Sequence, residues 1–291
     1  GDITSDGGAP VNARGVCWST TQNPTIADNY TTNGTGPGAF ISNITGLTSG
    51  TTYYVRAYAT NSVGTAYGNE LSFSTQFLCG DNFTDSRDGK VYTTVQIGTQ
   101  CWMKQNLNIG TRIDGTSQQA NNGTTEKYCY DNLETNCDVY GGLYQWDEMM
   151  QYSTIEGVQG ICHYGWHVPT YGEWLTLGSF VNNQPGWLCN SPDYYNAKAL
   201  AANTGWVNYS GLCSPCNILA TNNATGFSIL PGGYLSNDNL FHNLGYVNVF
   251  WSSSEDASEN AFCLGMACEF PSVGLDSGEK GFGYSLRCLK D

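Results

Sequence analysis

The sequence predicts a mainly β protein whose C-terminal part mixes strands with short helices. Residues 47–59 alternate between apolar and polar side chains, which is the period of a half-buried strand. The chain of 291 residues contains 36 Gly and 19 Tyr but only 12% charged residues, a composition that suits strands and long ordered loops. Every cysteine except Cys17 follows residue 78, which predicts a disulfide framework in the second part of the chain.

The charge balance narrows the classes of partner. The formal net charge is −14, with only 11 Lys and Arg residues. Nucleic acids and anionic lipid surfaces are therefore not expected as partners, because both need clustered cations. No apolar run approaches about 18 residues, so we expect no membrane insertion. Because cystines persist in oxidising compartments, we expect an extracellular or cell-surface protein whose signal peptide has been removed.

Residues 1–76 predict strands separated by turns. Strands are expected within 11–20, 38–45, 47–59 and 66–75, with a Gly-rich turn at 33–38. Alternation along residues 11–20 places Cys17 inward, on the same side as Val11 and Ala13. A small buried thiol is the simplest interpretation of Cys17, and an intermolecular disulfide is the alternative.

The order of these pieces resembles a known domain. The motifs are RGVCWST (14–20), NPTIAD (23–28), GTGPGAF (34–40) and the stretch from Gly46 to Thr75. Together they resemble a fibronectin type III-like domain of secreted Bacteroidota proteins. The resemblance implies an immunoglobulin-like β-sandwich of about seven strands. The family's first strand and most of its second have no counterpart in the sequence, so we expect an incomplete sandwich at 1–76.

An incomplete sandwich would expose an edge and part of its core. One interpretation is that the chain was cut or defined at this point. The other is that a strand of a neighbouring copy fills the groove, and head-to-tail contacts of that kind build filaments. The residues expected at this subunit interface are Ile3, Val11, Ala13, Val16 and Trp18.

Residues 77–291 form the second predicted domain. A hairpin is expected within 86–107 and a short helix over 171–181, with Thr170 as N-cap and Glu173 three positions later. A second short helix is expected over 193–203, and strands and long loops elsewhere.

This part also resembles a family. The motifs, in the family's order, include DSRDGKVYTTVQIGTQCWMKQNL (85–107), GICHYGWHVPTYGEW (160–174), ATGFSILPGGY (224–234), FWSSSE (250–255) and GYSLRCLKD (283–291). They resemble the Fibrobacter succinogenes major paralogous domain. That resemblance implies a disulfide-rich, C-type-lectin-like fold with two short helices and a small antiparallel sheet.

Spacing and the lectin-like resemblance together suggest a disulfide map. The expected pairs are Cys79–Cys101, Cys129–Cys137, Cys162–Cys288 and Cys263–Cys268. Two of Cys189, Cys213 and Cys216 can also pair. An even count then requires two free thiols, a bond to Cys17 or a bond between chains.

The lectin-like resemblance also raises the question of a ligand. It suggests carbohydrate or protein binding, with Trp251, Glu255 and Asp256 in the ligand loop, although the calcium-lectin signatures do not occur here. Calcium prefers several carboxylate and carbonyl oxygens. The candidate calcium ligands, with solvated side chains as the alternative, are Glu255, Asp256, Glu259 and Asn260; no other cofactor is expected. The tryptophans are interpreted as core rather than as a sugar platform.

Enzymatic motifs are not found. His163 and His167 lie four residues apart, but Gly165 and Pro169 argue against a helix that would align them. The single Cys-X-X-Cys, at 213–216, lacks a second ligand pair and a thioredoxin-like context. The sequence therefore predicts a non-enzymatic, secreted structural protein, a subunit of an extracellular fibre or surface assembly that forms homo-oligomers or polymers. The alternative is a cell-surface adhesin or carbohydrate-binding module whose partner is a glycan or a surface protein.

Overall fold

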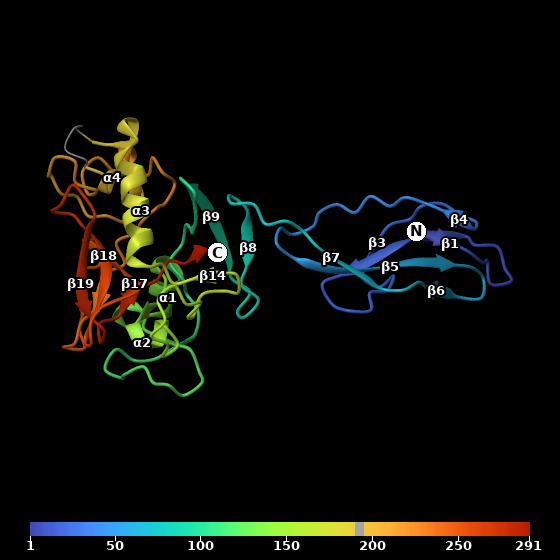
Figure 1. The fold of residues 1–291 in the computed structure, drawn as a ribbon, viewed down its shortest axis with the longest axis horizontal. Coiled ribbons are helices and arrows are strands. Elements are labelled where there is room, and N and C mark those ends of the chain that lie inside the picture. Colours follow the sequence, from blue (N-terminus) through green and yellow to red (C-terminus); the bar gives the residue numbers. More distant parts are fainter. Residues whose placement is uncertain (190–194) are drawn as a thin grey trace. The chain divides into compact units, whose positions relative to one another are not determined.

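The computed structural model describes residues 1–189 and 195–291. They form two compact units, Gly1–Phe83 and Thr84–Asp291, so the division lies a few residues beyond the predicted boundary after residue 76. Strands dominate both units and helices occur only in the second, as Figure 1 shows.

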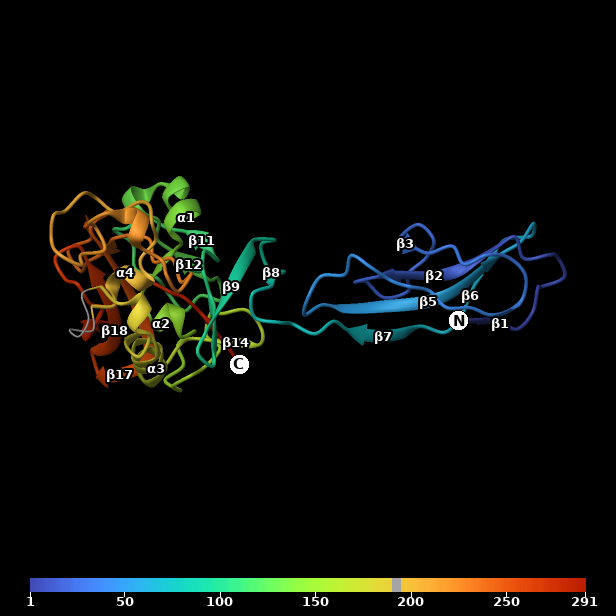
Figure 2. The ribbon, with the colours of Figure 1, turned by 90° about the horizontal axis from the view of Figure 1, so that it is seen from above.

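Unit 1 is built on one main sheet and a short ribbon. The sheet order is β3 (Asn29–Tyr30), β2 (Ala13–Ser19), β5 (Thr52–Thr60) and β6 (Thr65–Tyr67). β7 (Leu71–Ser74) pairs with the first half of β5, and β2 lies antiparallel beside β5 (Figure 2). The ribbon consists of β1 (Asp2–Ile3) and β4 (Gly38–Ala39).

The strand expected over 38–45 is largely absent. Only β4 forms there, and Ile41, just beyond it, is 86% exposed. The Arg14 guanidinium donates hydrogen bonds to the carbonyl oxygens of Gly36, Pro37 and Gly38. These bonds fix the chain as it enters β4, whereas β1 pairs with only two residues of it.

Unit 2 contains two larger sheets. In the first, the order is β14 (Trp166–His167), β21 (Leu289–Lys290), β10 (Gln100–Met103) and β9 (Val91–Ile97); β8 (Asn82–Thr84) spans the boundary between the units. The antiparallel β9–β10 pair confirms the predicted hairpin.

In the second sheet the order is β13 (Leu143–Tyr144), β20 (Tyr284–Ser285), β17 (Val247–Ala257), β18 (Asn260–Ala267) and β19 (Gly274–Glu279). Smaller pairs are β11 (Thr111–Arg112) with β12 (Glu126–Lys127) and β15 (Tyr234–Leu235) with β16 (Phe241–His242). The segment 250–260 is therefore not the expected loop but most of β17, the turn after it and the first residue of β18. Ser252 and Ser253 are buried there because they bond to the carbonyls of Phe262 and Pro169.

The helices of unit 2 are short. They are α1 (Glu134–Tyr140), α2 (Trp146–Met149), α3 (Tyr171–Asn182) and α4 (Ala197–Leu200), with 3-10 turns η1 (Tyr130–Asn132), η2 (Pro185–Trp187) and η3 (Leu219–Thr221). α3 confirms the predicted helix and begins with a capping box between Thr170 and Glu173. The helix expected over 193–203 is reduced to α4, and residues 193 and 194 lie outside the described residues. No helix within the described ranges is long and apolar enough to cross a membrane.

Aromatic side chains form the core of unit 2. Trp102 stacks on Trp174 with 4.6 Å between ring centroids, and Phe227 meets Trp102 edge-on. α3 packs beside β17 and β18 (Figure 1), and this places Trp174 against Phe250. Arg287, only 1% exposed, lies over the Phe227 ring, and burial lowers its pKa to about 9. Five tryptophans of unit 2 are thus core residues, as predicted: Trp102, Trp146, Trp166, Trp174 and Trp251.

Ten of the twelve cysteines are disulfide-bonded. The predicted pairs Cys129–Cys137 and Cys162–Cys288 are both present, and Cys79 and Cys101 are each disulfide-bonded. The other bonds are Cys189–Cys213 and Cys216–Cys268. Cys17 and Cys263 are free and buried.

The predicted Cys263–Cys268 pair is therefore wrong. Cys263 lies within β18 and Cys268 just beyond its end. Each residue of a strand advances by roughly 3.3 Å, so five residues separate the two Cα atoms by roughly 16 Å. A disulfide bridges at most about 7 Å between Cα atoms.

Candidate binding surfaces

One face of the unit 1 sheet is apolar and only partly covered. In an antiparallel sheet, directly opposed residues point to the same side. The register opposes Val16 to Ala57, Trp18 to Val55, and Val55 to Leu71. Leu71 is 69% exposed, while the others are half-buried. We call this surface the open face, and its residues are Val16, Trp18, Val55, Ala57, Leu71 and Phe73.

The opposite side of the same sheet is closed. Cys17 is fully buried there, and its thiol lies 3.3 Å from the Pro24 carbonyl oxygen. Tyr58 is 3% exposed, and its hydroxyl donates to the Thr31 carbonyl at 2.8 Å. The segment between β2 and β4 thus covers this side of the sheet. Apart from the main sheet, the only strands paired with each other within the described residues 1–83 are those of the short β1–β4 ribbon.

The five predicted interface residues do not lie together on one surface of unit 1. Val16 and Trp18 belong to the open face. Ile3 and Val11 are already buried, at 9% and 5% exposure, and half-buried Ala13 opposes Thr60 on the closed side. The five side chains therefore do not line one edge, because consecutive positions of β2 point to opposite sides of the sheet. Their contact with a second copy stays a prediction.

The predicted calcium ligands are not gathered into a metal site. Glu255 forms an ion pair with Lys280, and Asn260 pairs within the sheet opposite Ala257 and Glu279. Across residues 1–189 and 195–291, no group of three or more His, Cys, Asp or Glu side chains is arranged to hold a metal. The carboxylates at the β17–β18 turn are exposed.

Trp251 is not available to a ligand. Its side chain is fully buried, its indole N–H donates to the Tyr144 carbonyl at 2.8 Å, and Tyr284 packs against its ring. The predicted ligand loop of Trp251, Glu255 and Asp256 therefore presents only its two carboxylates. Trp251 lies in β17, and its position in that strand directs its side chain to the sheet face that Tyr284 covers.

A polar cavity of ≈410 Å³ lies beside the tip of the β17–β18 hairpin. Glu148 is 1% exposed and accepts hydrogen bonds from the Glu126 backbone N–H and the Tyr152 hydroxyl. Burial raises the pKa of the Glu148 carboxyl. The lining residues that matter here are Gln118, Gln145, Asp147, Glu148, Glu259 and Lys280. Only Glu259 was singled out in the sequence, because the others come from α2 and from loops that are distant along the chain.

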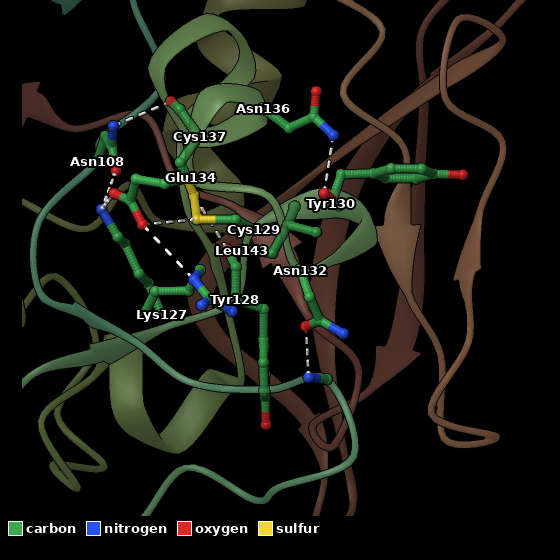
Figure 3. Close-up of a disulfide and its surroundings, with 12 residues drawn as sticks. Asn108, Lys127, Tyr128, Cys129, Tyr130, Asn132, Glu134, Asn136, Cys137 and Leu143 are labelled. Carbon is green, nitrogen blue, oxygen red and sulfur yellow. Dashed lines mark hydrogen bonds and ion pairs between the residues drawn. A yellow bond between two sulfur atoms is a disulfide. The ribbon is translucent and has the colours of Figure 1, made fainter.

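The Cys129–Cys137 disulfide fixes the turn that precedes α1, as Figure 3 shows. Lys127, 2% exposed, donates to Glu134 at 2.7 Å and to the Asn108 side-chain oxygen (Figure 3). Asp131 and Asn132 adopt positive φ values of 53° and 56°, a conformation that asparagine and aspartate tolerate better than most residues. This cluster has a structural role, because the Lys127 ammonium and the Glu134 carboxylate form an ion pair with each other.

His167 lies between two carboxylates. Its ring nitrogens are 3.0 Å from Glu173 Oε1 and 2.8 Å from Asp291 Oδ1. The hydrogen bond with Glu173 raises the pKa of His167 despite burial, and the bond from His167 helps to lower the pKa of Glu173. His167 therefore joins the start of α3 to the segment after β21.

Comparison with known proteins identifies one family. The family model of the Fibrobacter succinogenes major domain matches residues 95–290, which lie entirely within unit 2. No curated protein and no solved structure matches the chain.

Proposed function

The chain belongs to the Fibrobacter succinogenes major domain family, and we propose that it is a secreted, non-enzymatic subunit of an extracellular fibre or surface assembly. A strand or edge of a second copy would cover the open face of unit 1. The observation that carries the proposal is this half-exposed apolar sheet face; apart from the main sheet, the only strands paired with each other within the described residues 1–83 form a ribbon with two residues in each strand. A β-sandwich is stable when two sheets cover each other's apolar faces.

Burial of the open face would supply a driving force. A leucine side chain contributes roughly 1.5–3 kcal/mol when it is fully buried, and Leu71 is 69% exposed. The six side chains of the open face are uncharged. Arg14, which alternates with Val16 to the same side of β2, bonds through its guanidinium to the carbonyl oxygens of residues 36–38. Strands of another chain are added at exposed sheet edges, and an uncovered apolar face is buried when another layer packs on it.

The charge distribution favours unit 1 as the place where two copies meet. Its acidic residues are Asp2, Asp6, Asp28, Glu70 and Asp81, and its basic residues are Arg14 and Arg56. Unit 1 therefore holds three of the 14 net negative charges, so a contact through it minimises repulsion between copies. Because salt screens what repulsion remains, assembly should strengthen from low to physiological ionic strength.

An extracellular location agrees with the cystines. Ten disulfide-bonded cysteines are compatible with an oxidising compartment. The two free thiols are buried, which also suits a protein that persists among oxidants.

Sedimentation velocity with two matched variants tests the proposal. Leu71→Thr removes apolar surface from the open face, and Leu212→Thr does so at a position of unit 2 with 72% exposure. Leu71→Thr should weaken self-association about tenfold, since two carbon groups leave the contact at about 0.8 kcal/mol each. Leu212→Thr should leave it unchanged. Equal effects of the two variants, or a wild-type protein that stays monomeric at about 100 µM, would contradict the proposal.

The polar cavity beside the β17–β18 turn favours a second candidate function, that of an adhesin or carbohydrate-binding module. Carboxylate and amide groups such as Asp147, Gln118 and Glu259 can bond to sugar hydroxyls. A glycan array probed with wild type and with Glu259→Gln would test it. A glycan retained by the wild type and lost by the variant supports this role, and no retained glycan contradicts it.

A further inference from the structure

A second cavity lies on the outer face of the β17–β18–β19 sheet. Its volume is ≈540 Å³, within the roughly 300–1,000 Å³ range of small-molecule sites. We call it the trough. Residues that shape it are Val247, Val249, Gly265, Phe270, Asp276 and Tyr284. None of them belongs to the open face or to the polar cavity.

The floor of the trough is flat because two glycines meet there. Gly265 of β18 is opposed to Gly274 of β19. A Cβ atom built at either position would have no heavy atom within 4 Å, so the space above both is open. A planar group can therefore lie directly on the peptide backbone at van der Waals distance, roughly 3.5–4.0 Å.

Apolar side chains border this floor. Val249 is opposed to Gly265, and Val247 to Ala267, so both valines point to the same side of the sheet as the glycines. Phe270 also lines the trough and is 62% exposed. Isolated valines on a surface are ordinary, but a flat floor with apolar borders is typical of sites for aromatic rings.

One charge faces this apolar surface. Among the described residues that line the trough, Asp276 is the only Asp, Glu, Lys, Arg or His, and it is exposed. Its carboxylate accepts a hydrogen bond from the Ser277 backbone N–H at 2.8 Å, and no ion pair involving it occurs among the described residues. Cys263, opposed to Asp276, stays a neutral thiol, because burial raises its pKa to about 12. The local field, like that of the whole chain, favours a cation.

We propose that the trough binds a small aromatic compound that carries a cationic group. The ring lies on Gly265 and Gly274 between Val249 and Phe270, and the cation faces Asp276. The volume accommodates one ring with a short aminoalkyl arm. This site is independent of the assembly proposed for unit 1.

Three probes that share one ring test the charge preference. They are tyramine, which carries an ammonium group, p-cresol, which is neutral, and 3-(4-hydroxyphenyl)propionate, which is an anion. NMR titration should give a Kd near 1 mM for tyramine, about what ten non-hydrogen atoms supply. Affinity should fall in that order, by two- to fivefold at each step, because Asp276 is exposed and screened. Asp276→Asn should abolish the order, whereas Asp256→Asn, at an exposed carboxylate of the same sheet, should preserve it.

A second variant tests the floor. Gly265→Val places a side chain in the open space, so it should weaken tyramine binding more than tenfold while the fold is retained, because valine favours strands. Gly64→Val, at an open position in unit 1, is the control and should bind as the wild type does. Absence of tyramine binding to the wild type, or equal binding by Gly265→Val, would overturn the proposal. A change in sedimentation with Gly265→Val would also overturn it, since the trough would then be an interface between copies.

Discussion

The Cys162–Cys288 disulfide should contribute more stability to unit 2 than the Cys129–Cys137 disulfide does. The first bond joins residues 126 positions apart, and the second joins residues 8 positions apart. All four cysteines are at most 1% exposed. Replacing either pair by two alanines therefore removes similar buried atoms, and the length of chain that is closed is the main difference.

The expected magnitudes follow from the entropy of loop closure in the unfolded chain. The Cys162–Cys288 bond, which closes 126 positions, is expected to contribute about 5 kcal/mol to the free energy of unfolding. The Cys129–Cys137 bond, which closes 8 positions, is expected to contribute about 2.5 kcal/mol. The double variant Cys162→Ala/Cys288→Ala should thus lose about 2.5 kcal/mol more free energy of unfolding than Cys129→Ala/Cys137→Ala does.

Urea unfolding followed by tryptophan fluorescence measures this difference. Every tryptophan except Trp18 lies in unit 2, so the signal reports that unit. The m-values should be compared first, because loss of a cross-link can change the surface exposed on unfolding. Equal losses, or a larger loss for the short loop, would refute an account in which chain closure dominates.

Three further predictions concern single groups. Thiol titration without reductant should find no fast-reacting thiol in the native protein and two after denaturation, because Cys17 and Cys263 are 0% and 5% exposed; one fast native thiol would be the contrary result. His167 has a pKa raised above 6.5, so its stabilising effect should be complete below pH 6.5 and lost as pH rises through the higher folded-state value. His167→Gln should flatten that part of the stability profile, and an unchanged profile would exclude the contribution. Thr170→Ala should cost about 1 kcal/mol by loss of the capping box, while Thr176→Ala, in the exposed middle of α3, should cost less; equal unfolding midpoints would count against the cap.

Features that depend on neighbours in the chain were predictable. The alternation of residues 47–59 corresponds to β5, and the capping box at Thr170 was visible because its two partners are three residues apart. The β9–β10 hairpin likewise depends on a two-residue turn. These elements are specified by local propensity and pattern, which a single sequence contains.

Features that depend on register were not predictable. Ser252 and Ser253 look like loop residues, yet distant carbonyl groups satisfy their hydroxyls inside a strand. Cys268 pairs with Cys216, 52 residues away, rather than with Cys263 nearby. The glycine floor of the trough exists only because β18 and β19 oppose Gly265 to Gly274. Nothing in the spacing of such residues specifies which strands will meet.

Electron microscopy of the untagged protein at physiological salt, with Leu71→Thr alongside, tests the central claim most directly. The account predicts regular oligomers or fibres whose repeating contact lies on β2, β5 and β7 of unit 1, and fewer or shorter assemblies with the variant. Single particles of 31.5 kDa, or assemblies whose contacts leave the open face uncovered, would contradict it.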